Sequence, residues 1–274
     1  MDNTSQSFGD FELAGWEDAA TITEYDRHLS LVTTQCIGAL LDDAGVGTGS
    51  RVLDVATGAG YVAAAAALRG AAPLGIDFSG AQVRLARERY PAVEFEQADA
   101  ESLPFESDTF DAVVNAFGMC HLPDPDRALR EAFRVLKVGG RVAFAVWDVP
   151  ERTVGFGAVY AAIRAHGSLD VGLPVGPNFF LFSDPERSIE ALRNAGFVSS
   201  TVRYVPQVWR IADADRWFAI VSGASVRAAA TLRAQSAQAT DAIRVALRQA
   251  AASYRTDDHY ELPMPAVIAT AVKQ

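Results

Sequence analysis

A glycine-rich turn and three aspartates are the residues whose types and spacing could do chemistry. Val52–Tyr61 predicts a buried strand that runs into a turn containing Gly58 and Gly60, and then into a helix. Glycines let a ligand approach the backbone closely, and a helix start offers unpaired N–H groups. Asp54 precedes the glycines, where a carboxylate would face an ammonium group or a water molecule and would repel a diphosphate.

The other two aspartates follow the next two predicted strands. Asp77 comes directly after Pro73–Ile76, a position from which a carboxylate accepts hydrogen bonds from both ribose hydroxyls. Asp99 follows Val93–Glu96, where it would accept a hydrogen bond from the adenine amine. Any one of these acids could equally be a helix cap or a turn residue. All three in register with the glycines predict one crevice for an adenosine-containing ligand.

Alternating strand and helix patterns over residues 51–147 would position these groups. Short β-branched or apolar runs recur roughly every twenty to thirty residues, as strand–helix–strand units require. The predicted strands are Val52–Val55, Pro73–Ile76, Val93–Glu96, Asp111–Val114 and Arg141–Val146, and the predicted helices are Tyr61–Arg69, Ser79–Tyr90 and Asp126–Leu136. This pattern predicts a parallel sheet covered by helices.

The flanking regions predict further helices. Residues 10–44 form an aromatic helical lead-in, which is either a cap over the cleft or a helix on the sheet edge. Residues 150–180, rich in Gly, Pro and Phe, predict a flexible loop with a short helix. A helix at Asp184–Asn194 and a strand at Phe197–Val205 follow. A long helical region at Asp213–Tyr254 then precedes a final strand at Val267–Val272.

Composition and charge narrow the classes of partner. Half of the residues are hydrophobic and 21% are charged, as in packed globular proteins. The net charge of −10 disfavours nucleic acid and anionic membranes as partners. We expect a cytoplasmic protein, because neither a basic, apolar leader nor a membrane-spanning run is present. Cys36 and Cys120 belong to no metal-binding spacing, so no metal is expected.

Taken together, the motifs resemble those of class I S-adenosylmethionine (SAM)-dependent methyltransferases, in the small-molecule branch with a ubiquinone-biosynthesis-like pattern. The resemblance rests on Val52–Tyr61, Gly75–Gln82, Gln97–Phe105 with Asp108–Asp111, and Glu131–Gly140. Two positions depart from the family's pattern: Ala56 replaces a glycine, and Val138 replaces a common proline before the Gly-Gly pair.

The resemblance implies an α/β fold with a Rossmann-like, seven-stranded, mostly parallel sheet, helices on both faces and an added helical cap. Ala266–Val272 would be its antiparallel final strand. The expected domains are an N-terminal helical cap at 1–48, a cofactor-binding core at 49–150, and 151–274. The last part would complete the core around an inserted cap at 207–260.

The resemblance also implies how SAM would be held. Gly58 and Gly60 would pass under its methionine part, with backbone contacts from Ala56. Asp77 would hold the ribose. Phe78 and Gln82 would flank the adenine, and Asp99 and Ala100 would recognise its edge. Asn115 and Ala116 would face the methionine end and the donor methyl.

A catalytic base is needed only if the methyl acceptor must lose a proton, because in-line transfer depends mainly on orientation, worth ~7–11 kcal/mol in well-aligned systems. His121, which follows the fourth strand, is the first candidate. The alternative that it anchors its loop through hydrogen bonds carries slightly more weight. His28 and His166 are second candidates.

Aromatic residues suggest the acceptor. The predicted substrate contacts are Trp16, Tyr25, His28, Trp147 and Phe180, although plain packing explains most of them at least as well. The resulting hypothesis is methylation of a small hydrophobic or aromatic metabolite, as in secondary metabolism, at O, N or C. Two alternatives stay open. One is a methyltransferase fold that catalyses a cyclisation or rearrangement, and the other is an NAD-dependent oxidoreductase, which Asp54 and Asp99 disfavour. The oligomeric state is not predicted.

Overall fold

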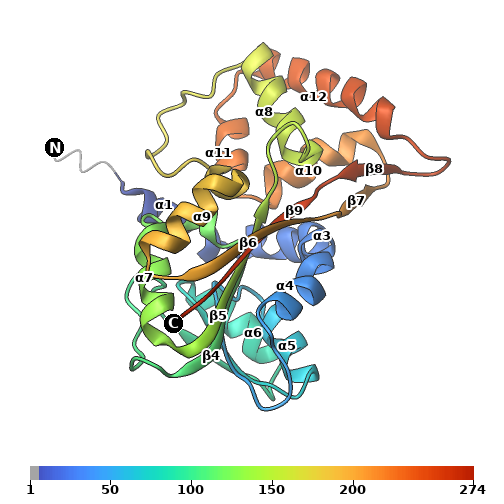
Figure 1. Ribbon diagram of the computed structural model, residues 1–274. Helices are drawn as coiled ribbons and strands as arrows, with labels where there is room; N and C mark the ends of the chain where they lie inside the picture. Colours follow the sequence, from blue (N-terminus) through green and yellow to red (C-terminus); the bar gives the residue numbers. More distant parts are fainter. Residues whose placement is uncertain (1–5) are drawn as a thin grey trace. The chain divides into compact units, whose positions relative to one another are not determined.

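The computed structural model describes residues 6–274, which form two compact units (Figure 1). The first unit contains the chain up to Val32, Asp148–Gly176 and Pro206–Pro265. The second contains Thr33–Trp147, Pro177–Val205 and Ala266–Gln274. Helix α4 (Ile37–Asp43) packs against strands of the second unit, and the expected domain bounds at 1–48, 49–150 and 151–274 stay predictions. The inserted segment of the first unit, Pro206–Pro265, lies close to the predicted 207–260.

The second unit is built on a seven-stranded sheet with the order β3-β2-β1-β4-β5-β9-β6. Strands β1 to β5 pair in parallel, and β9 pairs antiparallel with both β5 and β6. The predicted Rossmann-like fold class is thus confirmed. The strand bounds are β1 Arg51–Val55, β2 Ala72–Asp77, β3 Glu94–Gln97, β4 Phe110–Ala116, β5 Leu136–Trp147, β6 Val198–Val205 and β9 Ala266–Val272.

Helices cover both faces of this sheet. Figure 1 shows α4, α5 (Tyr61–Leu68) and α6 (Gly80–Arg89) on one side, and α7 (Pro125–Val135) and α9 (Pro185–Asn194) on the other. The helix starts follow ordinary capping chemistry, since Ser79 accepts a hydrogen bond from the Gln82 N–H and Asp124 accepts one from the Arg127 N–H. A 3₁₀ turn, Met119–His121, follows β4.

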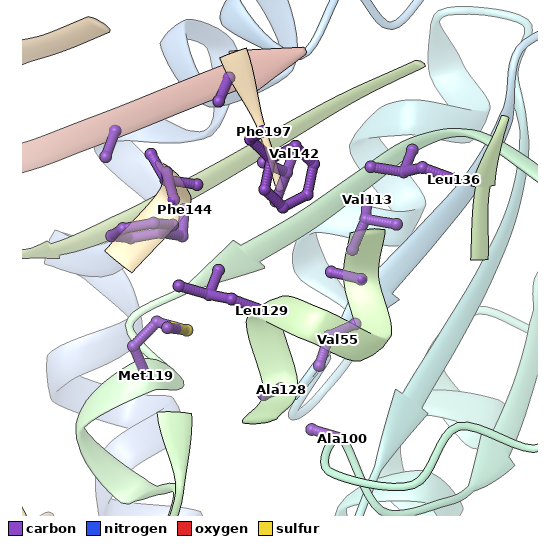
Figure 2. Close-up of a cluster of buried hydrophobic side chains, with 14 of the residues drawn as sticks. Val55, Ala100, Val113, Met119, Ala128, Leu129, Leu136, Val142, Phe144 and Phe197 are labelled. Carbon is purple, nitrogen blue, oxygen red and sulfur yellow. The ribbon is translucent and has the colours of Figure 1, made fainter. Parts of the chain in front are cut away.

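A large apolar cluster holds the strands against α7 and α9 (Figure 2). Val113, Val142 and Phe144 from β4 and β5 meet Leu129 of α7 in this cluster. A smaller cluster on the α5 and α6 face contains Ala63, Val83, Ala86 and Phe95. Each large apolar side chain buried in this way stabilises the fold by roughly 1.5–3 kcal/mol, so the strand ends are held rigidly.

The first unit is mainly helical. Its elements are α1 (Phe8–Glu17), α2 (Ala19–Glu24), a π-helix (Tyr25–Leu29), α8 (Val154–His166), α10 (Ala214–Gly223), α11 (Arg227–Arg233) and α12 (Ala237–Ala251), together with a two-stranded antiparallel sheet of β7 (Val208–Ile211) and β8 (Tyr260–Pro263). The short helix α3 (Ser30–Thr33) spans the division at Val32, and the 3₁₀ turn Thr34–Cys36 belongs to the second unit. No helix in residues 6–274 is both long enough and apolar enough to span a membrane.

Two sequence expectations about this unit were too simple. The expected long helical region at Asp213–Tyr254 is three helices, because separate caps start α10 at Asp213 and α12 at Ser236. The expected flexible loop with a short helix at 150–180 contains the 13-residue helix α8. Gly155 lets α8 pack closely on Met264, since a Cβ at this position would lie 2.5 Å from the Met264 sulfur.

Candidate cofactor and active site

The turn between β1 and α5 is shaped by three left-handed residues. Ala56, Gly58 and Gly60 have φ angles of 55°, 53° and 85°. The two glycines differ in their surroundings. A Cβ on Gly60 would lie 2.7 Å from Cζ of Phe95, whereas a Cβ on Gly58 would meet nothing nearer than Gln82 Oε1 at 4.0 Å. Gly60 therefore allows tight packing, and Gly58 borders open space.

Asp77 joins the end of β2 to this turn. Its carboxylate is 4% exposed. Oδ2 accepts a hydrogen bond from the Gly58 N–H at 2.9 Å, and Oδ1 accepts one from the Ser79 N–H at 2.9 Å. These two hydrogen bonds fix the orientation of the Asp77 carboxylate at the end of β2, and its contact with the ribose stays a prediction.

Asp54 lies beneath the same turn and is fully buried. Its Oδ2 accepts hydrogen bonds from Thr57 Oγ1 at 2.6 Å and from the Ala63 N–H at 3.0 Å. Oδ1 has no hydrogen-bond partner among the described residues. Burial raises the pKa of Asp54 to about 7; its two hydrogen bonds oppose this rise, and the negative charge of Asp77 adds to it. Thr57 was missed by sequence reasoning, although a hydroxyl residue three positions after an acid is a common local partner.

Asp99 and Ala100 lie on the loop after β3. Asp99 is exposed, and its Oδ1 accepts a hydrogen bond from the Glu101 N–H at 2.8 Å, as in an Asx turn. Ala100 belongs to the apolar cluster, so its backbone is the part that could meet a ligand (Figure 2). The observed contact of the Asp99 side chain is thus that of a turn residue, one of the two roles expected from the sequence. Its contact with adenine stays a prediction.

Phe78 and Gln82 lie at the start of α6. Phe78 is half-buried, and its carbonyl oxygen accepts a hydrogen bond from Gln97 Nε2 at 2.9 Å. Gln82 is buried, with its Oε1 on the open side of Gly58. Gln82 thus borders the turn, and the expected contacts of both residues with adenine stay predictions.

Asn115 connects the ends of β4 and β1. Its Nδ2 donates to the Val55 carbonyl at 3.0 Å, and its Oδ1 accepts from the Gly118 N–H at 2.9 Å. A Cβ on Gly118 would lie 2.6 Å from the Cβ of Ala56, so the loop that follows Ala116 packs against the glycine turn. Sequence reasoning missed Gly118, although a glycine soon after a strand was a visible signal.

His121 ends the 3₁₀ turn after β4 and is half-buried. Its ring lies edge-on to Phe179, with centroids 6.4 Å apart, and Phe179 in turn contacts Phe180 at 5.0 Å. Trp147 ends β5 and packs against Phe117 at 4.1 Å. Phe117 is also left-handed, with φ 60°, which is unusual for a bulky residue. These groups all belong to the second unit, with the glycine turn.

The other expected substrate residues belong to the first unit. Trp16 and Tyr25 are in edge contact at 5.4 Å. His28 Nε2 lies 3.5 Å from Glu24 Oε2, and burial lowers the pKa of His28 despite that carboxylate. The contacts within this unit account for all three by packing, and their role toward an acceptor stays a prediction. Residues 6–274 contain no cluster of His, Cys, Asp or Glu suited to a metal ion.

Comparison with known proteins supports the fold and the expected cofactor-binding role of the second unit. The methyltransferase domain family matches residues 53–144, from β1 into β5. Over these residues the chain is similar to methyltransferase domains. The match covers the glycine turn, all three aspartates, Asn115 and His121.

Relatives and solved structures show how far this similarity extends. A demethylmenaquinone methyltransferase of Clavibacter sepedonicus is 42% identical over 105 residues, which cover 37% of this chain and 43% of that protein. The chain spans less than half the length of the first curated relatives it matches. Phosphoethanolamine N-methyltransferase 2 of Haemonchus contortus has a similar fold, with TM-score 0.60 and 22% identity, covering 100% of this chain and 62% of that one. The YcgJ protein of Bacillus subtilis has TM-score 0.55 at 21% identity, with 87% and 97% covered.

Proposed function

We propose that this protein transfers a methyl group from SAM to a small hydrophobic or aromatic acceptor. The observation that carries the proposal is the contrast at Gly58. Its N–H is fixed by the Asp77 carboxylate, while the side where a Cβ would stand opens onto free space beside Gln82. A glycine backbone lets a nucleoside approach closely, and a neighbouring buried carboxylate can accept hydrogen bonds from its ribose.

The residues present fit an adenosyl sulfonium better than a dinucleotide. SAM supplies an electrophilic methyl group on a positively charged sulfur. Asp54 and Asp77 hold neighbouring turn residues, Thr57 and Gly58, so two carboxyl groups converge where a pyrophosphate would otherwise sit. The Asp77 carboxylate attracts a cation and repels a diphosphate, which disfavours the NAD-dependent alternative.

The protein's contribution would be orientation and exclusion of water. Asp77 would orient the ribose, and the turn would hold the methionine end beside Asn115 and Ala116. The methyl acceptor would approach the ends of β4 and β5, near His121 and Trp147. Aligning donor and acceptor in this way contributes ~7–11 kcal/mol in well-oriented systems.

The acceptor class is inferred from the aromatic residues of the second unit, Phe179, Phe180 and Trp147. The similarity to demethylmenaquinone methyltransferases makes quinols the first acceptors to test, and phenols and aromatic amines come next. The match to the first of those relatives covers 105 residues, which are 37% of this chain.

The test is S-adenosylhomocysteine formation on incubation with SAM and a panel of quinols, phenols and amines, with products identified by mass spectrometry. Methylated product with equimolar S-adenosylhomocysteine supports the proposal. Conversion of an acceptor without S-adenosylhomocysteine would favour the cyclisation or rearrangement alternative instead. Binding of NADH but not SAM would reject both.

His121 offers a sharper test of the chemistry. If His121 is the base, His121→Ala should lower kcat at least about tenfold with little change in SAM affinity, since base catalysis contributes roughly 10²–10⁴-fold. His259→Ala is the matched control, because His259 lies on the hairpin before β8 with Asp258 and Glu261 as partners. An unchanged kcat in His121→Ala would make His121 a loop anchor.

A further inference from the structure

The buried carboxyl of Asp54 has an unusual pattern of contacts. It is 0% exposed, and both of its hydrogen bonds, from Thr57 Oγ1 and the Ala63 N–H, go to Oδ2. Oδ1 is buried and has no donor among the described residues. An ionised carboxylate normally collects several donors when it is buried, because the buried charge is otherwise costly.

Within residues 6–274, the groups that act on Asp54 supply no positive charge to offset an ionised form. Its ladder neighbours are Gly75 on β2 and Val114 on β4, and α5 contributes only the Ala63 N–H. The charged group that acts on it is Asp77, at the end of β2, whose negative charge disfavours a second one. The two carboxyls hold adjacent residues, since Asp54 binds Thr57 and Asp77 binds Gly58.

We propose that Asp54 carries a proton in the ligand-free protein and releases it to solvent when the cationic end of SAM binds, so that cofactor binding is coupled to proton release. This inference rests on the proposed function, because it takes SAM as the ligand. In the free protein the neutral acid avoids an uncompensated buried charge. In the complex the sulfonium and ammonium charges favour the carboxylate, and the O–H bond is broken with the proton leaving to water.

The sign of the pH dependence follows directly. The ligand-free carboxyl has a raised pKa and the liganded one a lower pKa, so the complex binds fewer protons and SAM affinity rises with pH. For a free pKa of about 7, we expect release of about half a proton at pH 7 and an increase in affinity of about tenfold between pH 6 and pH 8.

Calorimetric titration with SAM in two buffers of different ionisation enthalpy measures the protons released. Asp54→Asn is the decisive variant, because its amide oxygen still accepts from Thr57 and Ala63 but it cannot titrate. The ligand's own ammonium contributes equally to both proteins, so the difference between them isolates Asp54. We expect proton release in the wild type and a lost pH slope in Asp54→Asn. Equal proton release in both proteins would overturn the proposal.

A ligand-free measurement separates this inference from the proposed function. Carboxyl carbon NMR should show one aspartate titrating near neutral pH that is absent in Asp54→Asn. In Asp77→Asn the same titration should move to lower pH, because a neighbouring negative charge is removed. If SAM does not bind but this titration is present, the proposed function fails while the protonated Asp54 stands. Titration of every aspartate below pH 5 would refute the protonation itself.

Discussion

Asp77→Ala is expected to weaken SAM binding at least about tenfold, measured by calorimetry at fixed pH. Two hydrogen bonds from ribose hydroxyls to a carboxylate would be lost, each worth about 1.5–3 kcal/mol, and every 1.4 kcal/mol is tenfold in affinity. The change also removes the acceptor for the Gly58 and Ser79 N–H groups, so the turn itself loosens.

Asp184→Ala is the matched control for this loss of a backbone acceptor. Asp184 caps α9 by accepting a hydrogen bond from the Glu186 N–H at 2.9 Å, and no part of the expected cofactor site involves it. Its removal should cost about 0.5–2 kcal/mol of stability and leave SAM affinity unchanged. Unchanged affinity in Asp77→Ala as well would remove Asp77 from the ribose site.

Gly60→Ala is expected to cause the largest loss of stability, about 2–5 kcal/mol. A left-handed alanine costs roughly 1–2 kcal/mol, and its Cβ would press on Phe95 at 2.7 Å and Tyr90 at 3.1 Å, as in an overpacked core. The free energy of unfolding from urea titration measures the effect. SAM binding should fail with it, because Gly60 forms the last corner of the turn.

Gly139→Ala separates the two contributions. Gly139 has φ 82°, close to the 85° of Gly60, but nothing lies within 4 Å of its Cβ position. This control should lose only the backbone cost, about 1–2 kcal/mol. If both variants lost the same stability, the contact between the glycine turn and β3 would have no energetic weight.

The fold was predictable from the sequence because it depends on local patterns, and the same patterns place the expected cofactor site. Apolar runs of strand length alternate with capped helices, and acids and glycines stand at strand ends; the carboxyl ends of parallel strands share one edge of a sheet. The elements missed were those whose residue types favour both helix and loop. Helix α8 was hidden by Gly155 and Gly157, which lower helix propensity and are kept for close packing.

The sequence by itself determined the succession of strands and helices along the chain and placed Gly58 and Gly60 on one turn, with Asp54 before it and Asp77 at the end of the next strand. Side-chain period, caps and glycine conformations act over a few residues, which is why these features were visible. Only the tertiary structure decided what each of these groups touches. It showed that Gly60 packs on Phe95 while Gly58 borders open space, that Asn115 ties two strand ends together, and that Asp54 is buried with one oxygen lacking a partner. These properties depend on residues distant in the chain, whose packing no local pattern records.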